Sequence, residues 1–112
     1  MQSLITLTFD DGLRCQFEKA VPILDEHGIR ATFFLTANCD STHEPWDGHT
    51  GDWWKIDWRD DDITSLRRLV SDGHEIGSHS LTHRDRNMRE NPRAEAYESK
   101  KLIEGWLGIK VT

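Results

Sequence analysis

The stretch Leu4-Ile5-Thr6-Leu7-Thr8-Phe9-Asp10-Asp11-Gly12 is an apolar run, rich in β-branched residues, that ends in two carboxylates and a glycine. It lacks a strict alternation of apolar and polar residues, which favours a strand buried on both faces of a parallel sheet. Gly12 permits a tight bend, so Asp10 and Asp11 can both stay near the end of this strand. An Asp-Gly pair at such a place is by itself ordinary turn chemistry.

The rest of the chain alternates between strand and helix patterns. The expected strands are 4–9, 31–35, 75–78 and 109–112. The expected helices, each with an apolar stripe, run from Phe17 to a stop at Gly28, from Asp60 to Gly73, and from Pro92 to Gly108. Pro22 either begins the main part of the first helix or kinks a longer one, and we favour the first alternative. Since no hairpin signal separates the strands, the pattern predicts an α/β domain with parallel strands and right-handed crossovers.

Composition limits the size and the partners of the domain. The 112 residues are 36% apolar, enough for one core. Fourteen basic against 20 acidic residues give a net charge of -6, so we expect no nucleic-acid partner. No apolar run approaches the ~20 residues of a membrane span, and no signal-peptide pattern opens the chain. We expect a cytoplasmic protein as the chain stands, or an extracellular or cell-surface one if it was trimmed from a precursor.

A second motif, His79-Ser80-Leu81-Thr82-His83, places two imidazoles at a spacing that one turn can bring to the same side. It follows the expected strand 75–78, and the carboxyl ends of parallel strands meet at one edge of a sheet. With Asp11 the histidines form a set that leaves metal positions open for water and substrate, as in a catalytic site. Ser80 and Thr82 are either supports for this loop or ordinary polar loop residues.

The long polar segment after residue 35 invites two functional interpretations. Its four tryptophans, Trp46, Trp53, Trp54 and Trp58, either stack on sugar rings or pack the segment onto the domain, and burial of large aromatics favours packing. A second metal site formed by Cys39, Asp40, His43, Asp47 and His49 is disfavoured by its irregular spacing.

Four further positions complete the candidates. Cys15 and Cys39 either form a disulfide or remain thiols. His74 and Glu75 are expected to be solvated residues at the entry of a strand.

Thr8–Gly12 and His79–His83, in this order, resemble the first two motifs of the polysaccharide deacetylase family, also called the NodB-homology domain or carbohydrate esterase family 4. Residues 28–35 and 73–83 resemble the same family. The resemblance implies a distorted parallel β/α barrel that removes acetyl groups from N- or O-acetylated sugars. It also implies one divalent metal ion, zinc first, with cobalt, nickel or manganese as alternatives.

Carried over by position, the resemblance makes Asp10 the general base and makes Asp11, His79 and His83 the metal ligands. The family's arginine-containing segment, its aspartate-tryptophan segment and its late histidine would lie beyond Thr112. We therefore expect residues 1–112 to be the amino-terminal part of a single catalytic domain, with four strands and three helices, truncated in the fourth strand.

Self-association and two other functions also stay open. An open barrel edge would favour pairing with another copy of the chain. The chain could also be a non-catalytic module that binds metal or carbohydrate, or a relative that hydrolyses amide or imide bonds of small molecules. The aromatic-rich segment favours an acetylated carbohydrate as the partner.

Overall fold

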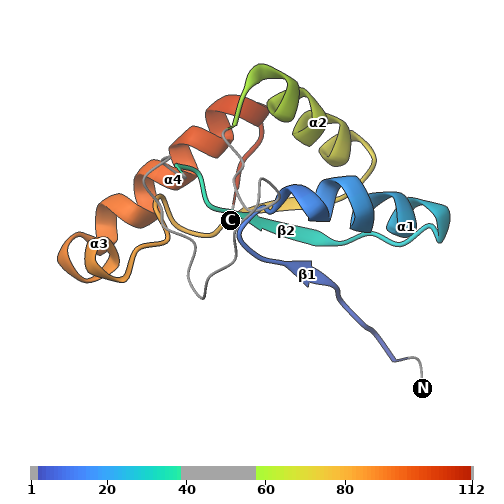
Figure 1. The fold of residues 1–112 in the computed structure, drawn as a ribbon, viewed down its shortest axis with the longest axis horizontal. Helices are drawn as coiled ribbons and strands as arrows, with labels where there is room; N and C mark the ends of the chain where they lie inside the picture. Colours follow the sequence, from blue (N-terminus) through green and yellow to red (C-terminus); the bar gives the residue numbers. More distant parts are fainter. Residues whose placement is uncertain (1–2, 39–57, 112) are drawn as a thin grey trace.

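The computed structural model describes residues 3–38 and 58–111. Within these ranges the chain forms a three-stranded parallel sheet with the order β1-β2-β3 (Figure 1). The strands are β1 (Thr8–Phe9), β2 (Thr32–Leu35) and β3 (Glu75–Ser78). Helices connect the strands, so the predicted α/β class with parallel strands is confirmed.

Strand β2 is the centre of the sheet, because it pairs with β1 on one side and with β3 on the other. Its residues Phe33 and Leu35 are fully buried. The ring of Phe33 stacks on Phe9 of β1 at a centroid distance of 4.9 Å, and on Phe17 at 5.6 Å. The core therefore forms around the middle strand.

The first helical segment begins with a π-helical stretch, η1 (Gln16–Ala20), and continues as α1 (Val21–Glu26). Pro22 lies in the first turn of α1, as predicted, where its missing N–H group is tolerated. The helical chain nevertheless starts before the proline. The N–H group of Val21 donates to the carbonyl of Gln16, five residues back, and this wider turn leads into the proline.

Helices α2 (Asp60–Ser71) and α4 (Pro92–Leu107) lie on the same side of the sheet and contact both β3 and each other (Figure 1). Both were predicted, and both bury their apolar stripe. Their fully or almost fully buried apolar residues are Leu66, Leu69 and Ile103. No helix in the described ranges has the length and apolarity that a membrane span requires.

A further helix, α3 (Asp85–Glu90), was not expected. It contains no buried residue, so its sequence has no apolar stripe from which a helix can be predicted.

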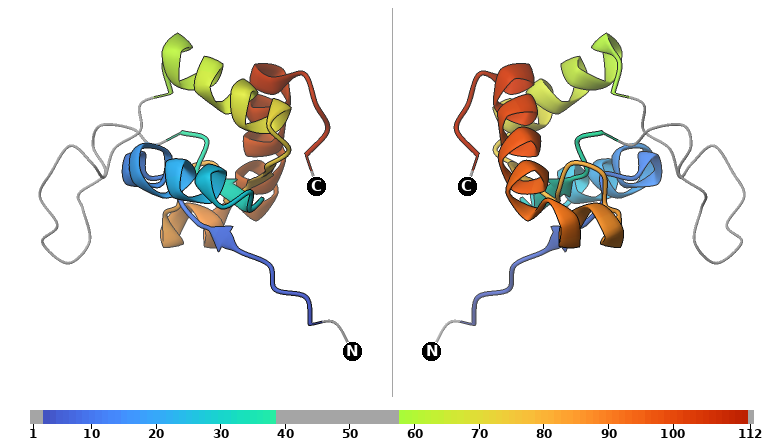
Figure 2. Two further views of the ribbon diagram at one scale, coloured as in Figure 1. Left: turned by 90° about the vertical axis from the view of Figure 1, so that its right-hand side faces the viewer. Right: turned by 90° about the vertical axis from the view of Figure 1, so that its left-hand side faces the viewer.

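The predicted first strand is too long. Only Thr8–Phe9 pairs with β2, and the preceding segment extends away from the body of the molecule (Figures 1 and 2). Leu4 and Ile5 are 95% and 85% exposed, so the expectation that the whole run is buried is wrong. The physical reason is that β2 begins opposite Thr8, which leaves the earlier residues almost without a partner strand in the described part of the chain.

The expected fourth strand does not form in residues 109–111. Val111 is buried, as a strand residue would be, but its N–H group donates to Oε1 of Glu104 at 2.9 Å. A side chain of α4 thus takes the place of a neighbouring strand. Thr112 lies outside the described residues.

Candidate metal centre

The carboxyl ends of the three strands bring the two sequence motifs together. Asp11 follows β1, and its carbonyl accepts the N–H group of Thr36 at 3.3 Å. His79 follows β3 and donates its N–H group to the carbonyl of Leu35 at 2.8 Å. The end of β2 therefore holds both motifs, one on each side.

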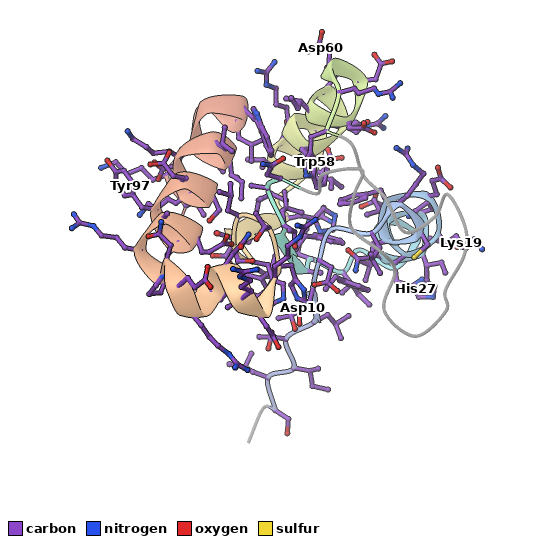
Figure 3. The ribbon with its side chains drawn as sticks, turned by 60° about the vertical axis from the view of Figure 1, so that its left-hand side comes forward. Asp10, Lys19, His27, Trp58, Asp60 and Tyr97 are labelled. Atoms are coloured by element: carbon purple, nitrogen blue, oxygen red, sulfur yellow. The ribbon has the colours of Figure 1, made fainter. Side chains whose placement is uncertain are left out.

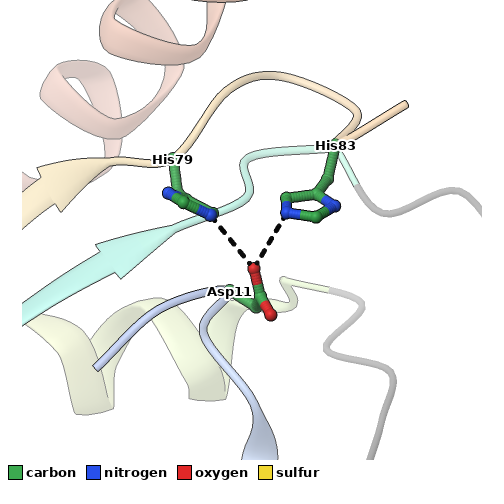
Figure 4. Close-up of side chains that lie close together, drawn as sticks. All are labelled: Asp11, His79 and His83. Carbon is green, nitrogen blue, oxygen red and sulfur yellow. Dashed lines mark ion pairs between the residues drawn. The ribbon is translucent and has the colours of Figure 1, made fainter. Parts of the chain in front are cut away.

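The side chains of Asp11, His79 and His83 meet in one cluster (Figure 4). Oδ1 of Asp11 lies 3.3 Å from Nε2 of His79 and 3.2 Å from Nε2 of His83. One ligand atom from each residue lies within 4.8 Å of the others. All three side chains are half-buried, so the cluster is reached from solvent.

The donor set fits a divalent metal ion. Oδ1 of Asp11 is buried and has no hydrogen-bond partner within the described ranges, although two imidazole nitrogens face it. Two ligands bonded at 2.0–2.1 Å to a tetrahedral zinc ion lie about 3.3 Å apart. The separations found here match that value. Three protein ligands also leave a position for water or substrate.

Backbone torsions at the cluster are unusual. Asp11 and His83 adopt positive φ values of 74° and 55°, and Ser80 adopts 71°. Such left-handed conformations are uncommon for residues other than glycine and persist where the surrounding contacts enforce them. The two ligand-bearing segments are therefore held in conformations that a free chain would rarely adopt.

Ser80 and Thr82 support the loop, which decides between the two interpretations of these residues. Oγ of Ser80 accepts the N–H group of His83 at 3.0 Å. The hydroxyl of Thr82 donates to Oε1 of Glu95 at 2.8 Å and accepts a hydrogen bond from Asn87 at 3.0 Å.

Asp10, the predicted general base, is not a member of the three-residue cluster. It is exposed, and it lies at the end of β1, next to Asp11 (Figure 3). Its carbonyl accepts a hydrogen bond of 2.6 Å from Nε2 of Gln16, whose Oε1 accepts the N–H group of Leu13. Gln16 thus fixes the turn that carries both carboxylates, a role that no sequence pattern indicated.

His74 corrects a second expectation, because it is buried rather than solvated. Nδ1 accepts the N–H group of Ala31 at 3.2 Å, and Nε2 faces Oδ1 of Asp25 at 3.3 Å. His74 lies before the amino end of β3, at the opposite end of this strand from His79. Its role is therefore to pair polar groups at the entry of the strand, and no chemistry is assigned to it.

Glu95 was also missed. It is buried, four residues before the buried Ser99 and eight before Ile103, so it belongs to the inward face of α4. This spacing is the only signal for it in the sequence, and a glutamate on a buried stripe is easily assigned to the solvent side.

Trp58 packs onto the domain, as predicted. It is partly buried against the core, whereas Tyr97 on α4 points outward (Figure 3). Its ring contacts Phe17 and Trp106, and its indole N–H group donates to the carbonyl of Thr36 at 2.9 Å. The other tryptophans of the segment, the second metal-ligand set and Cys39 lie outside the described residues. Both alternatives for Cys15 and Cys39, a disulfide or two thiols, therefore stay open.

Fold and site together define a parallel α/β domain with a two-histidine, one-aspartate candidate metal centre at the ends of its strands. A family model described as polysaccharide deacetylase matches residues 1–112. The chain belongs to this family, which confirms the resemblance drawn from the two motifs.

Individual relatives agree with this assignment. The chitin deacetylase of Colletotrichum lindemuthianum is 33% identical over 84 residues, which cover 75% of this chain and 28% of that protein. The uncharacterized protein YlxY of Bacillus subtilis (strain 168) is 30% identical over 95 residues, which cover 83% of this chain and 24% of that protein. The chain thus spans about a quarter of the length of these relatives.

A solved structure extends the comparison to the fold. It is the Xyl-CE4 domain of a multidomain xylanase from the hindgut metagenome of Trinervitermes trinervoides, which is 30% identical with a TM-score of 0.72. The match covers 100% of this chain and 47% of that chain.

Proposed function

We propose that residues 1–112 form the amino-terminal part of a metal-dependent polysaccharide deacetylase domain, folded as half of a parallel β/α barrel. The observation that carries this proposal is the meeting of Asp11, His79 and His83 at the carboxyl ends of parallel strands. The chain matches 47% of the chain of a solved CE4 domain, and this coverage supports the proposal that residues 1–112 form about half of such a domain.

The proposed substrate is an acetylated sugar of a polysaccharide, cleaved at the amide bond of an N-acetyl group or the ester bond of an O-acetyl group. Similarity to the chitin deacetylase of Colletotrichum lindemuthianum supports the N-acetylated class. A binding module without catalysis and hydrolysis of amide or imide bonds in small molecules remain as alternatives, which the experiment below separates.

Each site residue has a proposed role. Asp11, His79 and His83 hold one divalent ion, with zinc first and cobalt, nickel or manganese as alternatives, because neutral imidazoles and a carboxylate are the ligands such ions accept. When bound, the ion would lower the pKa of a coordinated water towards about 7 and polarise the acetyl carbonyl.

Asp10 serves as the general base. Its exposed carboxylate takes a proton from the attacking water while the water oxygen bonds to the carbonyl carbon. The carbon–nitrogen or carbon–oxygen bond of the acetyl group then breaks, and the sugar amine or hydroxyl leaves with the proton that Asp10 took from the water, while the acetyl group is released as acetate. Because Asp10 lies next to Asp11 but outside the ligand cluster, the two carboxylates can hold different roles.

Substitutions at the cluster test these roles in the intact protein. We expect Asp11→Ala and His79→Ala to abolish zinc binding in calorimetry. Asp10→Ala retains zinc but lowers acetate release from acetylated chito-oligosaccharides by about 100-fold or more. Asp72→Ala removes an exposed carboxylate from the end of α2 and serves as the matched control, with both properties unchanged.

The outcomes distinguish the alternatives. Loss of zinc in all three variants, or in none, would contradict the assigned roles. Tight binding of the oligosaccharide by the unmodified protein without acetate release would support a binding module, and release only from small amides or imides would change the substrate class.

A further inference from the structure

A buried carboxylate on α4 accepts hydrogen bonds from the loop between His79 and His83. Glu95 of α4 is only 5% exposed. Its Oε2 accepts the N–H groups of Leu81 at 3.0 Å and Thr82 at 2.8 Å, and its Oε1 accepts the hydroxyl of Thr82 at 2.8 Å. One side chain thus makes three hydrogen bonds to the middle of the loop.

These bonds lie between the two strained positions of the loop. Ser80 and His83 have positive φ values, and the N–H groups that Glu95 binds belong to the two residues between them. A carboxylate removed from water is costly unless its oxygens are hydrogen-bonded. Any loop conformation that moves Leu81 and Thr82 away from Glu95 is therefore disfavoured, and the strained conformation is the one that keeps the carboxylate paired.

The position of Glu95 is itself fixed by a separate contact. One turn further along α4, the hydroxyl of Ser99 lies 2.6 Å from that of Ser78, the last residue of β3. Ser99 is fully buried. The helix is thus joined to the strand that carries His79, while Glu95 holds the loop that leads to His83.

We propose that Glu95 is a positioning residue that keeps His83 beside His79 and thereby sets the affinity of the cluster for a divalent ion. This inference rests on the metal site of the proposed function. Glu95 acts through the backbone of Leu81 and Thr82 and through the Thr82 hydroxyl. It is not assigned as a ligand, because the cluster consists of Asp11, His79 and His83.

Zinc and cobalt titrations of the intact protein test the proposal. We expect Glu95→Ala to weaken the binding of both ions by about 10- to 100-fold, the range found when groups that orient metal ligands are removed. Glu95→Gln should recover most of this loss, because its amide oxygen can accept both N–H groups and its amino group can donate to the Thr82 hydroxyl. The visible spectrum of bound cobalt should change in Glu95→Ala and return in Glu95→Gln.

Glu104→Ala is the matched control, since it removes a carboxylate of the same helix that also accepts a backbone N–H group, that of Val111, away from the histidine loop. It is expected to lower the free energy of unfolding but to leave the metal affinity unchanged. In the metal-free protein, hydrogen exchange at the amides of Leu81 and Thr82 should accelerate in Glu95→Ala and not in Glu104→Ala.

Four results separate failure of this inference from failure of the proposed function. If the unmodified protein binds neither ion, the proposed metal site is wrong. Hydrogen exchange at the amides of Leu81 and Thr82 then decides by itself whether Glu95 holds the loop. If it binds and a folded Glu95→Ala variant binds equally well, the inference is overturned. Equal weakness of Glu95→Gln and Glu95→Ala would overturn it as well. Should Glu95→Ala not fold, Thr82→Val removes one of the three bonds, and unchanged affinity in that variant would contradict the proposal.

Discussion

Gly12 lies directly against the indole ring of Trp58. A Cβ atom at Gly12 would lie 2.9 Å from Cζ2 of Trp58 and 3.1 Å from Cδ2 of Leu35. Gly12 also adopts a φ of 75°, which side-chain-bearing residues rarely adopt. Position 12 is thus restricted to glycine for two independent reasons. Trp58, two residues before α2, packs against the turn that carries Asp11, a proposed metal ligand.

Gly12→Ala should lower the free energy of unfolding by about 2–4 kcal/mol, the sum of a left-handed backbone penalty and a steric overlap in a packed region. Gly28→Ala is the control. Gly28 has a φ of 64° but nothing within 4 Å of an added Cβ atom, so this variant should lose only about 1–2 kcal/mol. Urea denaturation measures both, and equal losses would show that the contact with Trp58 has no energetic role.

Trp58→Phe keeps an aromatic ring but removes the indole donor to the carbonyl of Thr36. We expect a loss of about 1–2 kcal/mol in the free energy of unfolding, because Thr36 is buried and its carbonyl loses a partner. Trp106→Phe is a suitable comparison, as the ring of Trp106 contacts Trp58 and is only partly buried. A Trp58→Phe variant as stable as the unmodified protein would contradict the assignment of Trp58 as a hydrogen-bonded anchor.

His74→Ala should destabilise the fold by about 3 kcal/mol, because it leaves a cavity and deprives the N–H group of Ala31 of its acceptor. Asp25→Asn alters the half-exposed partner of the same ring and should cost less than about 1 kcal/mol. Zinc affinity of folded His74→Ala should match that of the unmodified protein, since His74 and His79 lie at opposite ends of β3. A large loss of zinc affinity would show that the two ends of this strand are coupled.

Divalent metal should stabilise the protein if the cluster is a binding site. At a free zinc concentration 100 times the dissociation constant, linkage predicts a gain of about 2.7 kcal/mol in the free energy of unfolding. A chelator should reverse the gain, and Asp11→Ala should abolish it. His27→Ala, which changes an exposed histidine of the first helical region, should retain it. Thermal unfolding with and without zinc measures these differences, and an equal gain in Asp11→Ala would place the ion elsewhere.

Much of the site was predictable because it depends on short sequence motifs and on the parallel arrangement of the strands that precede them. An apolar run ending in Asp10 and Asp11, and a His79–His83 pair after a later strand, are each visible in the sequence. Parallel pairing then places both strand ends at one edge, and the hydrogen bonds between the end of β2 and both Asp11 and His79 bear this out. The main helices were predictable for the same kind of reason, since their apolar stripes repeat at helical spacing.

The predictions of burial from the sequence failed where the burial of a residue depends on a partner distant in the sequence. Leu4 and Ile5 are as apolar as buried strand residues, yet they are exposed because the strand beside them starts only opposite Thr8. Glu95 and His74 look like surface residues, yet they are buried because distant polar groups pair with them.

The amino-acid sequence by itself determined the class of fold, the family and the identity of the three clustered side chains, because periodicity and motif order are properties of the chain. Only the tertiary structure decided which polar residues are buried and how the histidine loop is held. The hydrogen bonds that stabilise its left-handed residues come from a helix that follows later in the chain, and no local pattern encodes that contact.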